Sequence, residues 1–172
     1  MSKCGCPGSK MMDFRKDEDH DKEHGHDHGH KHDHDHKEHC DSGAVQSELR
    51  QWPLQLHLVS PEAPYYQGAD VLLAADCVAY ALGDFHRRFL KGKSLAIACP
   101  KLDEGQDEYV AKITALIDDA KINTLTVLIM QVPCCRGLLA LAQNASSKAK
   151  RKVPVKYAVV SLQGDILEEN WA

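Results

Sequence analysis

Residues 124–139 read TLTVLIMQVPCCRGLL, and the fold predicted for the chain follows from the pattern in this stretch. Its first seven residues are apolar apart from Thr124 and Thr126, which is typical of a strand buried on both faces of a parallel sheet. A proline and two adjacent cysteines, Cys134 and Cys135, follow the run, and the apolar spacing of a helix begins there. The stretch therefore predicts a strand, a turn that carries thiols, and a helix.

The same arrangement occurs twice upstream. One buried-strand run ends at Cys77 and another ends at Cys99, and each is followed by residues with helical spacing. Strands that alternate with helices imply right-handed crossovers, and hence a small three-layer α/β domain with a mostly parallel sheet of about five strands. The predicted strands are residues 54–58, 69–75, 94–98, 124–130 and 153–162, and the predicted helices are residues 78–90, 106–120 and 134–145.

The first 43 residues differ in composition from the remainder of the chain. They hold 7 of the 21 basic residues, 11 of the 25 acidic residues and nine of the 11 histidines, with only scattered apolar residues. A segment of this composition cannot bury enough apolar surface to fold by itself. We therefore divide the chain into a disordered Cys/His-rich tail, residues 1–43, and an α/β domain that carries a cysteine site, residues 44–172.

The tail has the composition of a metal-binding segment. Neutral imidazole is a good ligand for Zn, Ni and Cu, and the interspersed carboxylates raise both its basicity and the local cation concentration. The CxC at the start can chelate a soft metal, although two thiols rarely complete a tetrahedral site. A solvated linker with incidental cysteines is the alternative. The expected metal ligands are Cys4, Cys6, His20, His24, His26, His28, His30, His32, His34, His36, His39 and Cys40.

Charge and hydropathy argue against several classes of protein. Residues 44–172 hold 14 basic and 14 acidic residues, so no basic field points to nucleic acid. No apolar run approaches the ~18–20 residues of a membrane span, and the start has no secretory apolar core, so we expect a cytoplasmic protein. Motifs of nucleotide, phosphate and hydrolase sites, such as GxGxxG, the P-loop, GxSxG and HExxH, are absent from the sequence.

The cysteines of the α/β domain are expected to form one site. Ligands of open parallel sheets bind outside the carboxyl ends of the strands, where the strand order reverses. If the strand at 71–75 lies between those at 95–98 and 125–130, strand spacing of about 4.8 Å brings the three following loops together. The helix that starts near Cys134 and Cys135, together with the charge of Arg136, should favour thiolate over thiol.

Four thiolates suit either tetrahedral Zn or an iron–sulfur cluster. Zinc usually takes CxxC knuckles, which this sequence lacks, and single cysteines on a rigid scaffold favour a larger [4Fe–4S] cluster. The adjacent pair Cys134 and Cys135 supplies either two ligands or one ligand and a neighbouring thiol. In the alternative interpretation, Cys77 and Cys99 are ordinary buried residues without a ligand role. The expected cluster ligands are Cys77, Cys99, Cys134 and Cys135.

Six segments of the sequence carry a resemblance to a known family: CGCPGS at 4–9, SELRQWPLQL at 47–56, APYYQGADVLLAADC at 63–77, FHRRFLKGK at 85–93, ACPKLD at 98–103 and VPCCRGL at 132–138. They resemble a family of small bacterial and archaeal proteins identified as iron–sulfur-cluster-binding or ferredoxin-like oxidoreductases, found largely in anaerobes. The chain departs from this family in two ways: it lacks the ferredoxin segment with CxxCxxCxxxCP spacing that many relatives contain, and it has Arg136 where relatives often read VPCCGG.

The residues and the resemblance lead to one principal expectation and two alternatives. The principal expectation is a [4Fe–4S] protein that transfers electrons to a redox partner protein or forms part of a redox complex, without independent catalytic activity. The first alternative is storage or delivery of Zn, Ni or Cu by the tail and the thiolate site. The second is thiol catalysis by Cys134 or Cys135, for which the sequence shows neither a nearby histidine base nor a CxxC motif.

Overall fold

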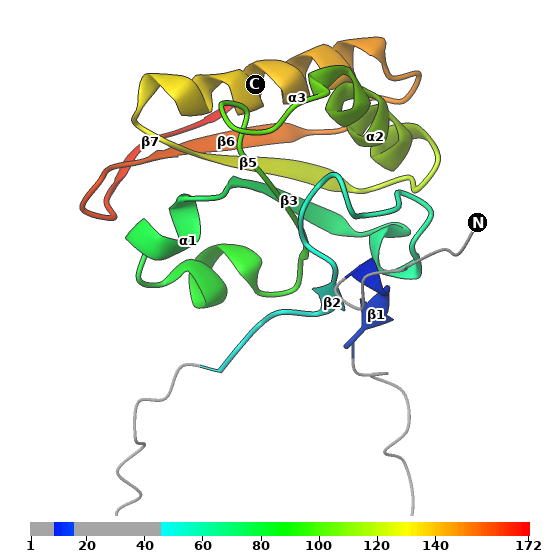
Figure 1. The fold of residues 1–172 in the computed structure, drawn as a ribbon, viewed down its shortest axis with the longest axis horizontal. Coiled ribbons are helices and arrows are strands. Elements are labelled where there is room, and N and C mark those ends of the chain that lie inside the picture. The colour runs from blue at the N-terminus through cyan, green and yellow to red at the C-terminus, as the bar shows by residue number, and fades with distance from the viewer. Residues whose placement is uncertain (1–8, 16–45) are drawn as a thin grey trace, which may run out of the picture.

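The computed structural model describes residues 9–15 and 46–172. Its centre is a five-stranded sheet with the order β4-β3-β5-β6-β7, and helices cover both faces (Figure 1). The four strands from β4 to β6 pair in parallel, and β7 pairs antiparallel to β6. The strands are β3 (Asp70–Ala75), β4 (Ser94–Ala98), β5 (Thr124–Met130), β6 (Val155–Val160) and β7 (Ile166–Trp171).

The helices form the outer two layers of the three-layer domain. Figure 1 shows α2 and α3 together above the sheet and α1 on the opposite side. Short turns of other helix types complete the connections between strands. The helices are α1 (Val78–Ala81), α2 (Gln106–Asp118) and α3 (Arg136–Lys148), and the turns are η2 (Pro64–Tyr66), the π-helical η3 (His86–Leu90) and η4 (Pro133–Cys135).

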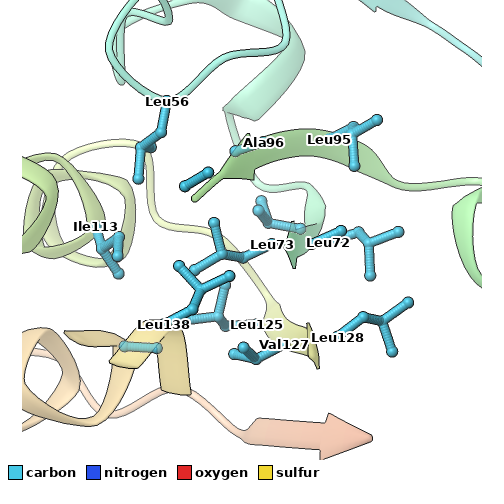
Figure 2. Packing of buried hydrophobic residues seen from close by; sticks show 14 of the residues in the cluster. Leu56, Leu72, Leu73, Leu95, Ala96, Ile113, Leu125, Val127, Leu128 and Leu138 are labelled. Carbon is cyan, nitrogen blue, oxygen red and sulfur yellow. The ribbon is translucent and has the colours of Figure 1, made fainter. Parts of the chain in front are cut away.

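The core follows from the continuous apolar runs of β3 and β5, which are buried on both faces of the sheet. Leu73 and Val127 are register partners and share the face that Leu138 of α3 covers, whereas Leu72 and Leu128 lie on the other face (Figure 2). Each of these side chains is fully or almost fully buried. Burial of one such side chain stabilises the fold by roughly 1.5–3 kcal/mol relative to exposure.

The strand predicted at residues 54–58 is wrong. Only Gln55 bridges to Ile97 at the free edge of β4, and the chain then turns away. The side-chain amide of Gln51 continues this edge: it donates to the Leu95 carbonyl at 2.8 Å and accepts from the Leu95 N–H at 3.0 Å. This segment therefore covers the edge of the sheet without adding a strand to it, and the fifth strand is β7.

The helix predicted at residues 78–90 is interrupted. Leu82 has an extended backbone, and Gly83 separates α1 from the π-helical turn η3. The apolar spacing nevertheless identifies the buried side, because Val78, Phe85 and Phe89 are all buried in the core. Periodicity thus predicted the buried face but not the break in the helix.

The predicted boundary at residue 43 does not separate all of the N-terminal part from the domain. The short strand β1 (Met12–Asp13) pairs antiparallel with β2 (Gln51–Trp52), and the Phe14 N–H donates to the Arg50 carbonyl at 2.6 Å. Residues 9–15 are thus joined to the domain by backbone pairing.

Candidate metal centre

Three cysteines lie at the carboxyl ends of three adjacent parallel strands. β3 lies between β4 and β5, which meets the condition set by the sequence, so the segments that carry Cys77, Cys99 and Cys134 leave the sheet at the same end of its strands. The chain continues from β3 into α1 on one face of the sheet and from β5 into α3 on the other (Figure 1). Cys77 and Cys134 therefore flank the point where the strand order reverses, which is the usual position of a ligand site in such folds.

The thiols on either side of this point interact with one another. Burial raises the pKa of Cys135 to about 11, with smaller upward contributions from the neighbouring thiols of Cys134 and Cys77 and a hydrogen bond with the Met130 backbone that acts in the opposite direction. The neutral thiol of Cys135 is therefore the stable form at neutral pH in the protein without a bound metal. The raised pKa runs opposite to the expectation that the start of the helix favours thiolate, because burial is the largest influence on Cys135.

Arg136 acts on a different part of the molecule from the one predicted. The hydrogen bond from Tyr157 on β6 to Glu168 on β7 raises the tyrosine pKa and lowers the glutamate pKa, and the charge of Arg136 adds a smaller contribution that lowers both. All three side chains line a groove of about 490 Å³ between α3 and the last two strands. The positive charge of Arg136, which the sequence suggested would act on the thiols, thus acts on the side chains of the neighbouring groove.

Cys99 is half-buried and lies in a tightly bonded turn after β4. Its N–H donates to the Asp103 carboxylate at 2.7 Å, and its carbonyl accepts from the N–H groups of Leu102 and Asp103 at 3.1 and 2.9 Å. The turn packs on the start of α3, because a Cβ added to Gly137 would lie 3.2 Å from the Pro100 side chain. This contact brings the Cys99 loop next to the helix that follows the cysteine doublet.

Two carboxylates that sequence reasoning did not select line the same edge. Asp76 precedes Cys77, and burial together with the charge of Asp103 raises its pKa, while a hydrogen bond from Gln55 lowers it. Tyr109 donates to Asp103 at 2.6 Å, and burial and this hydrogen bond raise the tyrosine pKa. The sequence signal for Asp103 was its position four residues after Cys99 at the end of a strand. An aspartate at this spacing can accept a hydrogen bond from the cysteine N–H.

All four cysteines of the described domain are free thiols. Within residues 9–15 and 46–172, no three His, Cys, Asp or Glu side chains are already arranged to hold a single metal ion. The predicted ligands of the tail lie outside the described residues: Cys4, Cys6, His20, His24, His26, His28, His30, His32, His34, His36, His39 and Cys40.

The fold and the site define a Rossmann-like α/β domain. The chain belongs to the Rossmann-like domain family, whose family model matches residues 63–172. It is also similar to a protein of Archaeoglobus fulgidus described as an uncharacterized protein, with 29% identity over 120 residues, which is 69% of this chain and 83% of the relative. No solved structure matches the chain significantly.

The length and hydrophobicity of the described helices can be compared with those of a membrane-spanning helix. In the part of the chain that the structure describes, every helix falls short of the length and hydrophobicity needed to cross a bilayer.

Proposed function

We propose that this chain is a cytoplasmic iron–sulfur protein that holds a [4Fe–4S] cluster on Cys77, Cys99, Cys134 and Cys135 and transfers electrons to a partner protein or within a redox complex. One observation carries the proposal: these four thiols follow the carboxyl ends of three neighbouring parallel strands, around the reversal of the strand order. Chain segments far apart in sequence thereby present their thiols at the same end of the sheet, which supports cluster binding by single cysteines.

The chemistry of the thiols fits such a group. The four cysteines are not paired in disulfides. After burial, the largest cause, Cys134 and Cys77 also raise the pKa of Cys135, so they disfavour its charged thiolate form. An iron centre relieves this repulsion, because coordination replaces the thiol protons with positively charged metal. When bound, a [4Fe–4S] cluster supplies one-electron redox chemistry, and the chain holds it and sets its surroundings.

The exposure of the site supports a protein partner. Cys77 and Cys134 are exposed, whereas Cys135 is buried. Tyr80 and Leu102, each three residues after a cysteine on the segments that follow β3 and β4, are 93% and 81% exposed. A few exposed apolar side chains suit the small interfaces of transient electron-transfer complexes.

Anaerobic purification of the full chain tests the proposal. We expect a brown protein with about four iron and four sulfide per chain. The variants Cys77→Ala and Cys99→Ala should lose most of this iron, whereas a matched triple variant, Cys4→Ala with Cys6→Ala and Cys40→Ala, should retain it. A colourless protein that contains one zinc per chain, or equal iron in both sets of variants, would contradict the assignment.

A second candidate function is the capture of Ni, Zn or Cu by the histidine-rich segment, with transfer to the thiol site. The observation that favours it is the irregular HxH alternation with Asp and Lys between His20 and Cys40, which differs from the uniform run of a purification tag. In this case the thiols receive or sense a single ion. Removal of the segment distinguishes the two candidates.

A further inference from the structure

The backbone of Cys99 is held by one side chain, the carboxylate of Asp103. Asp103 Oδ2 accepts the Cys99 N–H at 2.7 Å, while the Asp103 N–H donates back to the Cys99 carbonyl at 2.9 Å. The Gln106 amide adds a further bond to the Pro100 carbonyl at 2.7 Å. The peptide groups on both sides of Cys99 are therefore held by this turn.

Helix α2 holds the Asp103 carboxylate from the other side. Tyr109 is fully buried on α2, and its hydroxyl donates to the same Oδ2 at 2.6 Å. The His57 ring packs against the Tyr109 ring with centroids 4.4 Å apart, and a His57 ring nitrogen lies 2.9 Å from the Glu104 carbonyl oxygen. The aspartate thus connects the thiol-bearing turn to a rigid helix.

Asp103 also contributes negative charge to this side of the site. Its charge acts on Asp76, the residue before Cys77. Asp76 receives only a long hydrogen bond from the Gln55 amide, 3.4 Å to Oδ2, and its buried Oδ1 has no hydrogen-bond partner among the described residues. Two carboxylates therefore lie next to the turns of Cys77 and Cys99.

We propose that Asp103 is a positioning residue for the thiol site: it orients Cys99 as a ligand, and its charge lowers the reduction potential of the cluster held there. The second part rests on the proposed function. Outer-shell partners of metal ligands orient those ligands and tune the metal, and the net charge and hydrogen bonds around a cluster set its potential. Because Asp103 occupies the Cys99 N–H, this N–H does not donate to a cluster sulfur, which also favours a low potential.

The experiment compares Asp103→Asn, Tyr109→Phe and a control, Asp118→Asn. Asp103→Asn keeps the size of the side chain and an acceptor oxygen but removes the charge, and Tyr109→Phe removes only the second bond to Oδ2. Asp118 is matched to Asp103 because its carboxylate also accepts two hydrogen bonds that join α2 to a neighbouring segment, here from the backbone N–H groups of Lys150 and Arg151 at 3.0 and 2.9 Å. It connects α2 to the segment after α3, at the opposite end of the strands from the cysteines.

Two measurements are made on each variant. The first is the rate at which iodoacetamide modifies Cys99 in metal-free protein, resolved by mass spectrometry. The second is the reduction potential of anaerobically purified protein, from a redox titration followed by visible absorption. We expect Asp103→Asn to raise the potential and to speed modification of Cys99 severalfold. Tyr109→Phe should speed modification to a smaller extent, and Asp118→Asn should change neither readout.

The outcomes separate this inference from the proposed function. If the wild-type protein holds a cluster but Asp103→Asn leaves both the potential and the Cys99 rate unchanged, the positioning role is wrong. An equal effect of Asp118→Asn would likewise overturn it, since a general loss of stability would then explain the data. If the wild-type protein holds no cluster, the proposed function fails, and the Cys99 rate alone decides whether Asp103 positions this thiol.

Discussion

At the residue scale, the four cysteines are chemically unequal although the sequence presents them alike. Cys77 and Cys134 are exposed, Cys99 is half-buried in a bonded turn, and Cys135 is buried with a raised pKa. A thiol reacts through its thiolate, so burial and neighbouring thiols protect Cys135 from modification while its neighbours remain accessible. The order in which the thiols react is therefore a direct readout of the site geometry.

Alkylation of metal-free protein at several pH values tests this inequality. Because Cys135 stays protonated below its pKa of about 11, its rate should rise about tenfold per pH unit from neutral pH until close to that value. Iodoacetamide labelling with mass spectrometry gives the rate at each cysteine. The variant Cys134→Ser should move the rise of Cys135 to lower pH, because the neighbouring thiol contributes to the upward shift. A Cys135 rate that levels off near pH 8 would contradict the burial of this thiol.

At the scale of elements, the turn between β6 and β7 packs against the end of α1. Gly164 lies in this turn with φ +92°, and a Cβ placed on it would overlap the carbonyl oxygen of Ala81. Ser161 closes the turn through its backbone, accepting from Gly164 at 3.1 Å and donating to the Asp165 carbonyl at 2.8 Å. The antiparallel edge strand thus depends on a glycine that touches the short helix after Cys77.

The substitution Gly164→Ala should destabilise the fold by roughly 1–3 kcal/mol, because it adds both backbone strain and a steric overlap. Thermal unfolding followed by circular dichroism measures the loss. Gly68→Ala serves as a control for strain alone, since its φ is +60° with nothing within 4 Å of the added Cβ. Gly83→Ala meets nothing within 4 Å either and has no positive φ, so it should change stability by about 0.5 kcal/mol or less. Equal stability of all three variants would contradict the packing of the turn.

At the scale of the whole molecule, the sheet and both helical layers lie within residues 46–172. The described residues before this range contribute only β1, whose two residues are exposed, and its pairing with β2. Among the described residues 9–15, none belongs to the hydrophobic core. We therefore expect residues 46–172 to fold without the histidine-rich segment.

A chain that starts at Gln46 should fold cooperatively, with a melting temperature close to that of the full chain. It should also keep its iron while losing Ni and Zn binding measured by equilibrium dialysis, because the histidines are removed and the four thiols remain. If cells that express this shortened chain become more sensitive to Ni, Zn or Cu, the second candidate function gains support. Unchanged metal tolerance would count against that candidate, and a failure to fold would contradict the division of the chain.

Local pattern predicted most of the fold. Continuous apolar runs identified the strands β3, β4 and β5 because strands buried on both faces need apolar side chains at every position. The apolar pattern did not predict β7, because the residues LEENW of this strand are mostly polar and exposed. An edge strand is held by backbone pairing rather than by apolar burial. Residues 54–58 alternate like a strand, yet they bond to β4 at one position only.

The sequence by itself determined that this chain contains an α/β domain and that thiols follow three of its strands, because both properties depend on neighbouring residues along the chain. Only the tertiary structure decided which strands are neighbours, that Asp103 holds Cys99, and that Cys135 is a buried, protonated thiol. Strand order, burial and the carboxylate contacts arise from pairings between residues distant in sequence. The free energy of these pairings depends on the whole packed arrangement, and a local sequence pattern carries no information about that arrangement.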